Sequence, residues 1–386
     1  MLADSLFWHR LFPMRGARCA TLRRNRAARN GWRMPGNIQT NPVNSLPQEI
    51  TPAQWTAFVA SQPRAHILQL LQWGALKSRF GWGAEPYALA DLDGYTCAAL
   101  VLEKRLPMGL GKMAYVPMGG YATDEFAYDA LWFSIRRESN AAFLKVEPGH
   151  LAPGEELDMR AMGFRPSPQS IQPPRTIIID ITGEQDVILA RMSQSTRRKV
   201  RKSLRSEVTY RKGTRKDLLA FCQLMRETGA RNNFGVHEAV YYEAVYELFM
   251  PSYGALLLAE RADELLAAVM VFALGQTAWY LYGASSRTAG SSYASYGIQW
   301  SAIRWAKRRG CQSYDMWGVP DYDEAELEAQ YQQRSDGLWG VYGFKRGWGG
   351  ELRRSMGAWD MPFSQLQYGA YRLALKYKGI DAPGMG

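Results

Sequence analysis

Residues that ligate metals or form disulfides are scarce in this sequence. Its 386 residues include four cysteines and four histidines, and no two cysteines form a CxxC pair. The histidines are too scattered for an HExxH-type metal site. We therefore expect no metal site and no disulfide framework, and a reducing compartment is the default for such a chain.

Motifs of several large enzyme classes are also missing. There is no GxSxG nucleophile elbow, no GxxxxGK[ST] phosphate loop and no GxGxxG fingerprint after a strand. We therefore expect no cofactor. One run, Leu265–Ser285, lacks charge over a length that could cross a bilayer, but turn chemistry at Gly275–Thr277 interrupts it. This run is predicted to be a buried β-hairpin rather than a membrane span.

Positive charge is concentrated in two segments of a chain with a formal net charge of +11. Residues 1–36 hold eight arginines and one aspartate, net +7, and residues 191–217 hold eleven basic residues and two acids, net +9, so the remainder is −5. Such local basicity favours a polyanionic partner. Residues 1–40 match no secretory signal and are predicted to be a disordered basic extension, with a transit peptide as the alternative.

Two stretches of mixed helix and strand follow this extension. Thr51 as N-cap and Pro52 at the first helical position predict the first helix, and the first stretch ends near residue 170. The order restarts with a strand over 176–180 and a basic helix over 186–205, and closes with a strand-like segment over 340–345. Antiparallel hairpins with few βαβ crossovers predict a duplicated α+β (mixed α/β) fold.

The most specific pattern lies in residues 279–351. It combines a helix containing QW and AK, a glycine at 310, the segment YDMWG, an insertion, and the segment GFKRGWGG. In this order the segments resemble the FemABX family, the tRNA-dependent aminoacyltransferases that form peptidoglycan interpeptide bridges. Further similar segments, at residues 69–77, 115–119, 197–203 and 231–235, extend the resemblance over roughly residues 45–378.

The resemblance implies a fold of two tandem GNAT-like (acyl-CoA N-acyltransferase-like) domains, in agreement with the duplication. We assign residues 41–175 plus 357–386 to the first domain, because the C-terminal helix returns to it in the family, and residues 176–356 to the second. No segment is long enough for the coiled-coil arm of some members, so the chain is similar to the arm-less, FemX-like members.

The family moves an amino acid from aminoacyl-tRNA to an amine of the stem peptide of a peptidoglycan precursor, UDP-MurNAc-pentapeptide or lipid II. The resemblance therefore implies aminoacyl-tRNA and this precursor as partners. It also implies a monomer in the cytoplasm, with peripheral contact to anionic lipid at the inner face of the membrane. The amine would attack the aminoacyl ester directly, through a tetrahedral oxyanion, without a metal or a covalent enzyme intermediate.

The same resemblance implies three catalytic residues, Lys345, Phe344 and Asp315. Lys345, which follows Phe344 in the glycine-rich segment, is expected to stabilise the charge that develops on the ester carbonyl or the tRNA terminus. Asp315, in the YDMWG segment, is expected to orient the incoming amine. The alternatives are a solvated lysine at a strand end and an aspartate that caps a turn.

Four further residues are implied in acceptor binding. Lys77 and Arg231 would bind its phosphates, since Arg donates bidentately and Lys acts as a point charge. Tyr115 and Tyr282 would hydrogen-bond to or stack with it. The alternative for Lys77 is a cation at a helix end, and that for Arg231 is a loop arginine. Tyr115 and Tyr282 would otherwise be half-buried strand tyrosines.

The basic helix is implied in tRNA binding, through the residues Arg197, Arg198, Arg201 and Lys202. Contacts of this kind reach phosphates, carry no sequence information and weaken steeply with salt. The alternatives for this helix are a solvated face and contact with lipid headgroups.

Two other functions compete with the implied transfer. The first is a GNAT-type N-acyltransferase that takes acyl-CoA to a small-molecule or peptide amine. Its pyrophosphate loop would fall at residues 291–297, which contain one glycine and two tyrosines and suit that role poorly. The second is a protein that only binds nucleic acid or a membrane surface.

Overall fold

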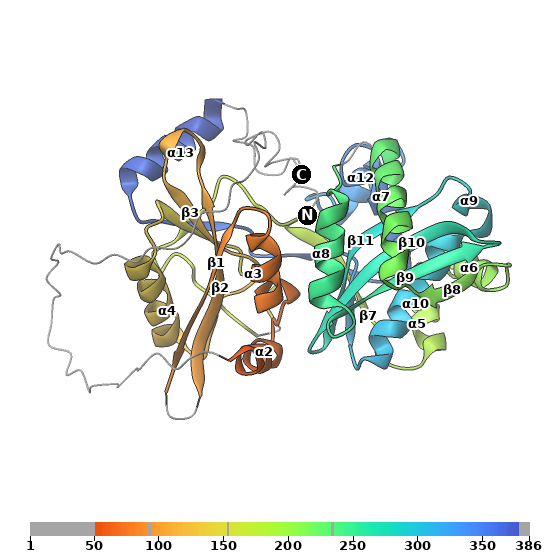
Figure 1. Cartoon of the computed structure of the whole chain (residues 1–386), viewed down its shortest axis with the longest axis horizontal. Helices are drawn as coiled ribbons and strands as arrows, with labels where there is room; N and C mark the ends of the chain where they lie inside the picture. Colours follow the sequence, from red (N-terminus) through yellow and green to blue (C-terminus); the bar gives the residue numbers. More distant parts are fainter. Residues whose placement is uncertain (1–50, 92–93, 153, 233–234, 378–386) are drawn as a thin grey trace, which may run out of the picture.

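The computed structural model describes residues 51–377 except 92–93, 153 and 233–234. The predicted extension over 1–40 therefore lies outside the described residues. Figure 1 shows two lobes side by side, each built on one seven-stranded sheet. The division of the chain into two domains at the predicted boundaries stays a prediction.

The first lobe contains a sheet in the order β1-β2-β3-β5-β14-β6, with β4 beside β2. Its strands are β1 (Gly83–Ala90), β2 (Tyr95–Arg105), β3 (Lys112–Val116), β4 (Tyr121–Ala122), β5 (Phe143–Val146), β6 (Arg165–Pro166) and β14 (Trp359–Pro362). β3 and β5 are parallel, whereas β14 comes from the end of the chain and lies antiparallel to β5 and β6. The last segment of the chain thus returns to the first sheet.

Helices cover both faces of the first sheet. They are α2 (Pro52–Ser61), η1 (Ile67–Gln69), α3 (Leu71–Ser78), η2 (Pro107–Gly109), α4 (Glu125–Glu138) and α13 (Gln365–Tyr377). Along β2, Leu100 and Leu102 face the core beneath α3, whereas Ala99 and Val101 face the core beneath α4. Thr51 begins α2 with a capping box, in which its hydroxyl accepts from the amide of Gln54.

The second lobe contains a sheet in the order β13-β7-β12-β11-β10-β9-β8. Its strands are β7 (Arg175–Asp180), β8 (Thr209–Lys212), β9 (Gly254–Arg261), β10 (Glu264–Leu274), β11 (Thr277–Ser285), β12 (Ser313–Asp315) and β13 (Glu351–Arg354). β10 and β11 form the predicted antiparallel hairpin, which lies at the centre of the sheet. Burial of this hairpin on both faces explains why the segment carries no charge.

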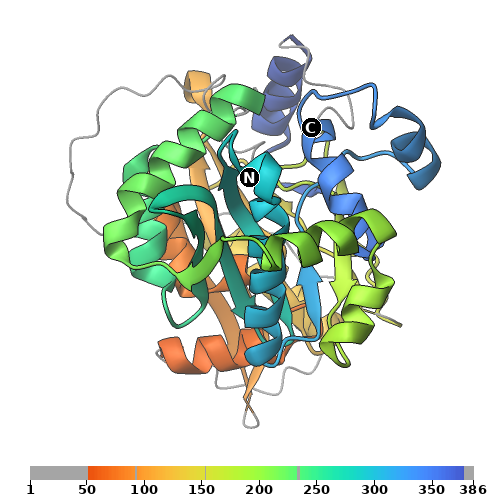
Figure 2. The same ribbon diagram turned by 90° about the vertical axis from the view of Figure 1, so that its right-hand side faces the viewer.

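The second lobe has helices on both faces of its sheet as well (Figure 2). They are α5 (Gln185–Arg191), α6 (Gln194–Leu204), η3 (Arg215–Asp217), α7 (Leu218–Asn232), α8 (Ala239–Phe249), α9 (Ala289–Ser292), α10 (Ala294–Arg308), α11 (Glu324–Gln330), α12 (Trp339–Lys345) and η4 (Arg346–Trp348). The longest of these helices have 15 residues. No helix among the described residues is long and apolar enough to cross a membrane.

Two of the predicted elements are wrong in detail. The helix expected over 186–205 is two helices, because Met192 is extended and Ser193 caps α6 by accepting from the amide of Thr196. The strand expected over 340–345 is the helix α12. Its buried side chains are Trp339, Tyr342 and Lys345, and this spacing of three residues is helical.

Candidate active site

The two lobes meet along a seam between α3 and α8. Ring centres lie 6.4 Å apart for Trp73 and Phe249, and 5.0 Å apart for Phe80 and Tyr241. Near the outside, Arg79 forms an exposed ion pair with Glu247 at 2.8 Å. One hydrophobic core runs through both lobes across this seam. The two lobes therefore pack against each other through a shared hydrophobic core and are not joined by a linker alone.

Lys77 lies in this seam, in the last turn of α3, with only 5% of the residue exposed. Its Nζ is 5.0 Å from the centre of the Trp73 ring and 5.8 Å from that of Tyr241 on α8. The Tyr282 hydroxyl on β11 donates to that of Tyr241 at 3.2 Å, and the His237 ring stacks on Tyr241 with centres 3.7 Å apart. Two predicted acceptor-binding residues, Lys77 and Tyr282, thus meet around Tyr241, a residue that the sequence reasoning missed.

Tyr115 lies deeper, on β3, and is 2% exposed. Its hydroxyl donates to the carboxylate of Glu147 and accepts from the side-chain amide of Gln172 at 3.0 Å. Glu147 also accepts from the backbone amides of Ile171 and Gln172, and burial raises its pKa. Tyr115 therefore holds the connection between the lobes, and its predicted contact with an acceptor stays a prediction.

Strand β11 links the seam to a second buried group. A β-bulge at Leu281 puts Trp279 and Tyr282 on the same side of the sheet, in the core shared by the lobes. The Trp279 ring lies 4.7 Å from that of His66 in the first lobe, and Trp279 pairs in register with Asp315 on β12. Three residues of strand span about 10 Å, so this second group begins one short stretch of β11 away from Tyr282.

Lys345 is the centre of the second group. It is 6% exposed, and its Nζ donates to the backbone carbonyls of Trp317 at 3.1 Å and Gly318 at 2.7 Å. Burial lowers its pKa to about 7, against a smaller opposing effect of the Asp315 carboxylate. Lys345 is therefore neither solvated nor at a strand end, and its charge can change near neutral pH.

Asp315 holds the turn to which Lys345 is bonded. Its carboxylate accepts from the Thr176 hydroxyl and, at 2.7 Å, from the backbone amide of Trp317. Trp317 has a left-handed φ of 62°. Burial raises the pKa of Asp315, whereas the nearby His150 opposes that effect. These are the contacts of the turn-capping alternative, and orientation of the incoming amine by Asp315 stays a prediction.

Three polar atoms around this turn are buried without a hydrogen-bond partner among the residues that the structure describes. They are Nε2 of His66, Nδ1 of His150 and the indole nitrogen of Trp317. The rings of His66 and Trp317 are 5.6 Å apart, and Nδ1 of His66 accepts from the amide of Leu68, which assigns the proton to Nε2. Burial lowers the pKa of His66 to about 3, so it is neutral at physiological pH. This group was not predicted from the sequence, because its histidines are widely spaced along the chain.

An aromatic bridge joins Lys345 to the basic helix α6. The half-buried Phe344 ring lies 5.0 Å from Tyr296 and 5.8 Å from Trp348, measured between ring centres. Lys199 of α6 lies 4.8 Å above the Tyr296 ring and donates to its hydroxyl at 3.1 Å. Phe344 therefore works as a packing link between α12 and α6, and its predicted role at the reacting centre stays a prediction.

The glycines that follow Lys345 allow α5 and α6 to pack closely on this turn. A Cβ at Gly347 would lie 2.2 Å from Oγ1 of Thr196, and one at Gly349 would lie 2.3 Å from the carbonyl oxygen of Arg191. The Gly347 carbonyl accepts from the amide of Ser193 at 3.0 Å. The glycine-rich segment thus serves tight packing, which places the start of α6 beside the lysine.

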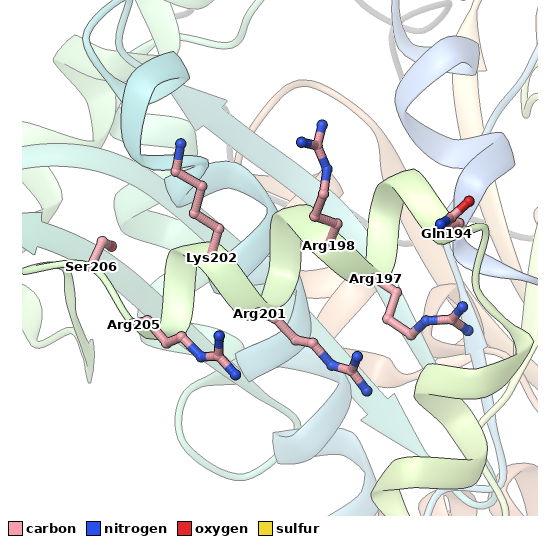
Figure 3. A pocket seen from close by; sticks show the side chains of 7 residues that line it. All are labelled: Gln194, Arg197, Arg198, Arg201, Lys202, Arg205 and Ser206. Carbon is pink, nitrogen blue, oxygen red and sulfur yellow. The ribbon is translucent and has the colours of Figure 1, made fainter.

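The outer surface of α6 lines a hollow of about 570 Å³, and most of the side chains around it are basic (Figure 3). Its lining residues are Gln194, Arg197, Arg198, Arg201, Lys202, Arg205 and Ser206. Figure 3 shows two rows on the helix, with Arg197, Arg201 and Arg205 on one side and Arg198 and Lys202 on the other. A spacing of four residues aligns each row along the helix axis.

The hollow contains most of the predicted tRNA-binding cations in exposed positions. Arg198, Arg201 and Lys202 are exposed, whereas Arg197 is half-buried and donates to the carbonyl of Ala190 at 3.1 Å. The sequence of α6 contains no acidic residue. All four predicted cations are therefore brought together on one surface, which meets Lys345 through the aromatic bridge.

Arg231 is the predicted residue that the described contacts leave outside these groups. It lies near the end of α7, half-buried, and Nη2 donates to the Ser285 hydroxyl at 3.4 Å. Ser285 follows Tyr282 by three residues on β11. Binding of an acceptor phosphate by Arg231 stays a prediction.

Comparison with solved structures identifies the class of fold. The crystal structure of FemX superimposes with a TM-score of 0.73 at 21% identity, over 84% of this chain and 98% of FemX. A conserved protein of unknown function from Bacteroides thetaiotaomicron gives a TM-score of 0.54 at 12% identity, over 81% of this chain. Together with the two sheets, these likenesses confirm the predicted fold class: two tandem GNAT-like units with no coiled-coil arm among the described residues.

Sequence comparison identifies the family. A profile of the FemAB family matches residues 154–262 and 258–376. The lipid II:glycine glycyltransferases of Staphylococcus saprophyticus and Staphylococcus aureus are both 24% identical to the chain, covering 81% and 83% of it and 91% and 93% of the relatives. The chain belongs to the FemAB family, as its motifs predicted, and is a transferase.

Proposed function

We propose that this transferase moves an amino acid from aminoacyl-tRNA to an amine of the stem peptide of a peptidoglycan precursor, either UDP-MurNAc-pentapeptide or lipid II. The names of the two staphylococcal relatives, which describe transfer of glycine to lipid II, support a peptidoglycan acceptor. The proposed place of action is the cytoplasm, at the inner face of the membrane, with the protein as a monomer.

The observation that carries the proposal is the buried lysine beside a basic surface. The ammonium of Lys345 has three N–H donors, and two of them donate to the carbonyls of Trp317 and Gly318. One donor therefore remains for an ester oxygen. In a buried site such a donor stabilises a developing oxyanion far better than in water. The cations of α6 would hold the phosphates of the tRNA while its aminoacyl end reaches Lys345.

The seam supplies the proposed acceptor site. Lys77 and Tyr282 lie there around Tyr241, and β11 leads from Tyr282 to the turn beside Lys345. A lysine with buried aromatic neighbours suits a phosphate group of the acceptor, while the tyrosines suit its uncharged parts. The acceptor amine must lose a proton before it attacks, because an alkyl ammonium titrates near a pKa of about 10.4.

The experiment is a transfer assay with a panel of charged tRNAs, each carrying a labelled amino acid. Both soluble UDP-MurNAc-pentapeptide and lipid II serve as acceptors. We expect label in the acceptor with at least one charged tRNA, and loss of that transfer in Lys345→Met but not in the exposed control Lys216→Met. Absence of transfer from every charged tRNA would contradict the proposal.

The acyl-CoA alternative finds little support at the start of α10. A Cβ at Gly297 would lie 1.9 Å from the Tyr210 hydroxyl, so the glycine serves packing against neighbouring side chains and does not open a phosphate cradle. The discriminating measurement is a titration with acetyl-CoA, for which we expect no saturable binding.

A further inference from the structure

Helix α13, at the outer edge of the first lobe (Figure 1), packs on that lobe through one apolar face. Tyr368, Tyr371 and Leu375 are between 2% and 6% exposed. The rings of Tyr368 and Tyr371 lie 5.2 Å and 4.7 Å from the Phe143 ring, measured between centres. This face accounts for the position of the helix.

The opposite face of α13 is apolar too, and it is exposed. Leu366, Leu373 and Tyr377 are 85%, 57% and 87% exposed. With 3.6 residues per turn, their spacing of seven and four residues puts them within about 40° of one another, on the side of the helix opposite to the buried face. A surface helix normally has one apolar stripe, so the second stripe requires an explanation.

The charges on α13 identify what this strip would meet. Arg372 and Lys376 are exposed beside the strip, and the sequence of α13 contains no acidic residue. The exposed Arg165 lies 5.4 Å from the centre of the Tyr368 ring and adds a third cation to the helix. An apolar strip with cations along one side and a tyrosine at its end is typical of a helix that lies in the interface of an anionic bilayer.

We propose that α13 docks the protein on an anionic lipid bilayer, with Leu366, Leu373 and Tyr377 at the headgroup boundary and Arg372 and Lys376 on lipid phosphates. A second copy of the chain fits less well. Three such side chains offer on the order of 400 Å², about half of what each partner buries in a stable protein interface. A lipid-linked acceptor would also require a bilayer contact, and this last argument alone rests on the proposed function.

The test is co-sedimentation of the full chain with vesicles of phosphatidylcholine, with and without phosphatidylglycerol. The test variant is Leu366→Gln with Leu373→Gln. Its matched control is Phe126→Gln with Phe133→Gln, two side chains that are 86% and 65% exposed at the same spacing on α4, across the sheet. We expect binding to the mixed vesicles to fall at least tenfold in the test variant and less than twofold in the control.

An equal loss in both variants, or no loss in either, would overturn the assignment of α13. A dimer in solution that dissociates in the test variant, without vesicle binding by the wild type, would assign the strip to a second copy instead. Circular dichroism of each variant shows whether the fold is kept, since these side chains are exposed in the native state.

A charge variant separates α13 from the other basic helix. Arg372→Gln with Lys376→Gln should abolish the preference for phosphatidylglycerol, whereas Arg198→Gln with Lys202→Gln on α6 should leave vesicle binding within twofold. The reverse result would place the lipid contact on α6 and overturn the proposal. These measurements contain neither tRNA nor acceptor, so they stand or fall independently of the transfer reaction.

Discussion

Two of the buried lysines, Lys77 in the first lobe and Lys345 in the second, are surrounded by different chemistry. Lys77 lies among the aromatic rings of the seam, whereas Lys345 donates hydrogen bonds to the backbone carbonyls of Trp317 and Gly318. Aromatic faces attract a cation, which suits a residue that would bind a fixed anion. Burial at Lys345 brings its pKa to about 7, which suits a residue that responds to charge appearing during a reaction.

The largest effect is expected for Lys345→Met. If its ammonium stabilises the oxyanion, kcat falls by about 10²- to 10³-fold, the usual effect of removing one such donor. The measurement is single-turnover transfer at saturating acceptor, with Lys216→Met as the control. A fall in kcat of less than threefold would show that Lys345 is only structural.

The same variant has a stability signature. The pKa of Lys345 falls from 10.5 to about 7 on folding, so burial of its charge destabilises the protein below pH 7, and that penalty is relieved as the pH rises from 7 to 10.5. At about 1.4 kcal/mol per pKa unit, the penalty is at most on the order of 5 kcal/mol, and the two carbonyls left unpaired reduce the gain. Urea unfolding should therefore show Lys345→Met more stable than wild type at pH 6, by less at pH 9.

The pH dependence of single-turnover transfer tests the charge state directly. Below pH 7 the rate should rise about tenfold per unit as the acceptor amine loses its proton, and above pH 7 loss of the Lys345 ammonium should cancel that gain. In Lys345→Arg the cation persists, so the rate, although lower, should keep rising above pH 8. A wild-type rate that rises without a break up to pH 9 would contradict an essential ammonium.

Lys77→Met tests the other side of the comparison. We expect about a tenfold rise in the KM for the acceptor with kcat nearly unchanged, since a charge pair to a phosphate at a desolvated site contributes about 1.5–3 kcal/mol. The control is Lys104→Met, because Lys104 is a lysine of β2 that also lies over an aromatic ring, 5.3 Å from the centre of Trp82. A fall in kcat as large as that of Lys345→Met would contradict separate roles for the two lysines in binding and in the chemical step.

A smaller effect is expected on the surface of α6. Arg198→Gln with Lys202→Gln should weaken tRNA binding roughly fivefold to tenfold and lower the salt slope of log K by about 1 to 2, as loss of two phosphate contacts implies. The measurement is tRNA affinity across a salt series, with Arg136→Gln and Arg137→Gln on α4 as the control. An unchanged slope would leave α6 without a phosphate partner.

The smallest expected effect is that of Tyr282→Phe. It removes the hydrogen bond to the Tyr241 hydroxyl and keeps the ring, so the KM for the acceptor should rise about twofold to fivefold, in line with about 0.5–1 kcal/mol for one neutral hydrogen bond. Steady-state kinetics with varied acceptor provides the check. No change in KM would remove Tyr282 from the acceptor site.

Local chemistry explains which elements the sequence predicted well. Thr51 and Pro52 begin α2 as expected, because capping and a preset φ act within one turn of helix. The uncharged run Leu265–Ser285 is a hairpin because its central turn residues interrupt two strand-like halves. Each of these predictions needed only a few neighbouring residues.

The segment over 340–345 shows where such reasoning ends. Its valine, tyrosine and phenylalanine favour a strand locally, yet it is helical because Tyr342 packs into a core with Ile177 and Leu327. The insertion α11 holds this helix further, since Glu328 accepts from the Tyr342 hydroxyl at 2.8 Å and from Arg346. Packing against residues far away in the chain decided the element.

The sequence by itself determined the family, the duplicated α/β pattern and the basic character of α6, because motifs, periodicity and charge are properties of neighbouring residues. Only the tertiary structure decided that Tyr241 stands between Lys77 and Tyr282, and that Trp317, His66 and His150 surround the turn beside Lys345. It also decided the pKa of Lys345, because a lysine titrates near 7 only when the fold removes it from water.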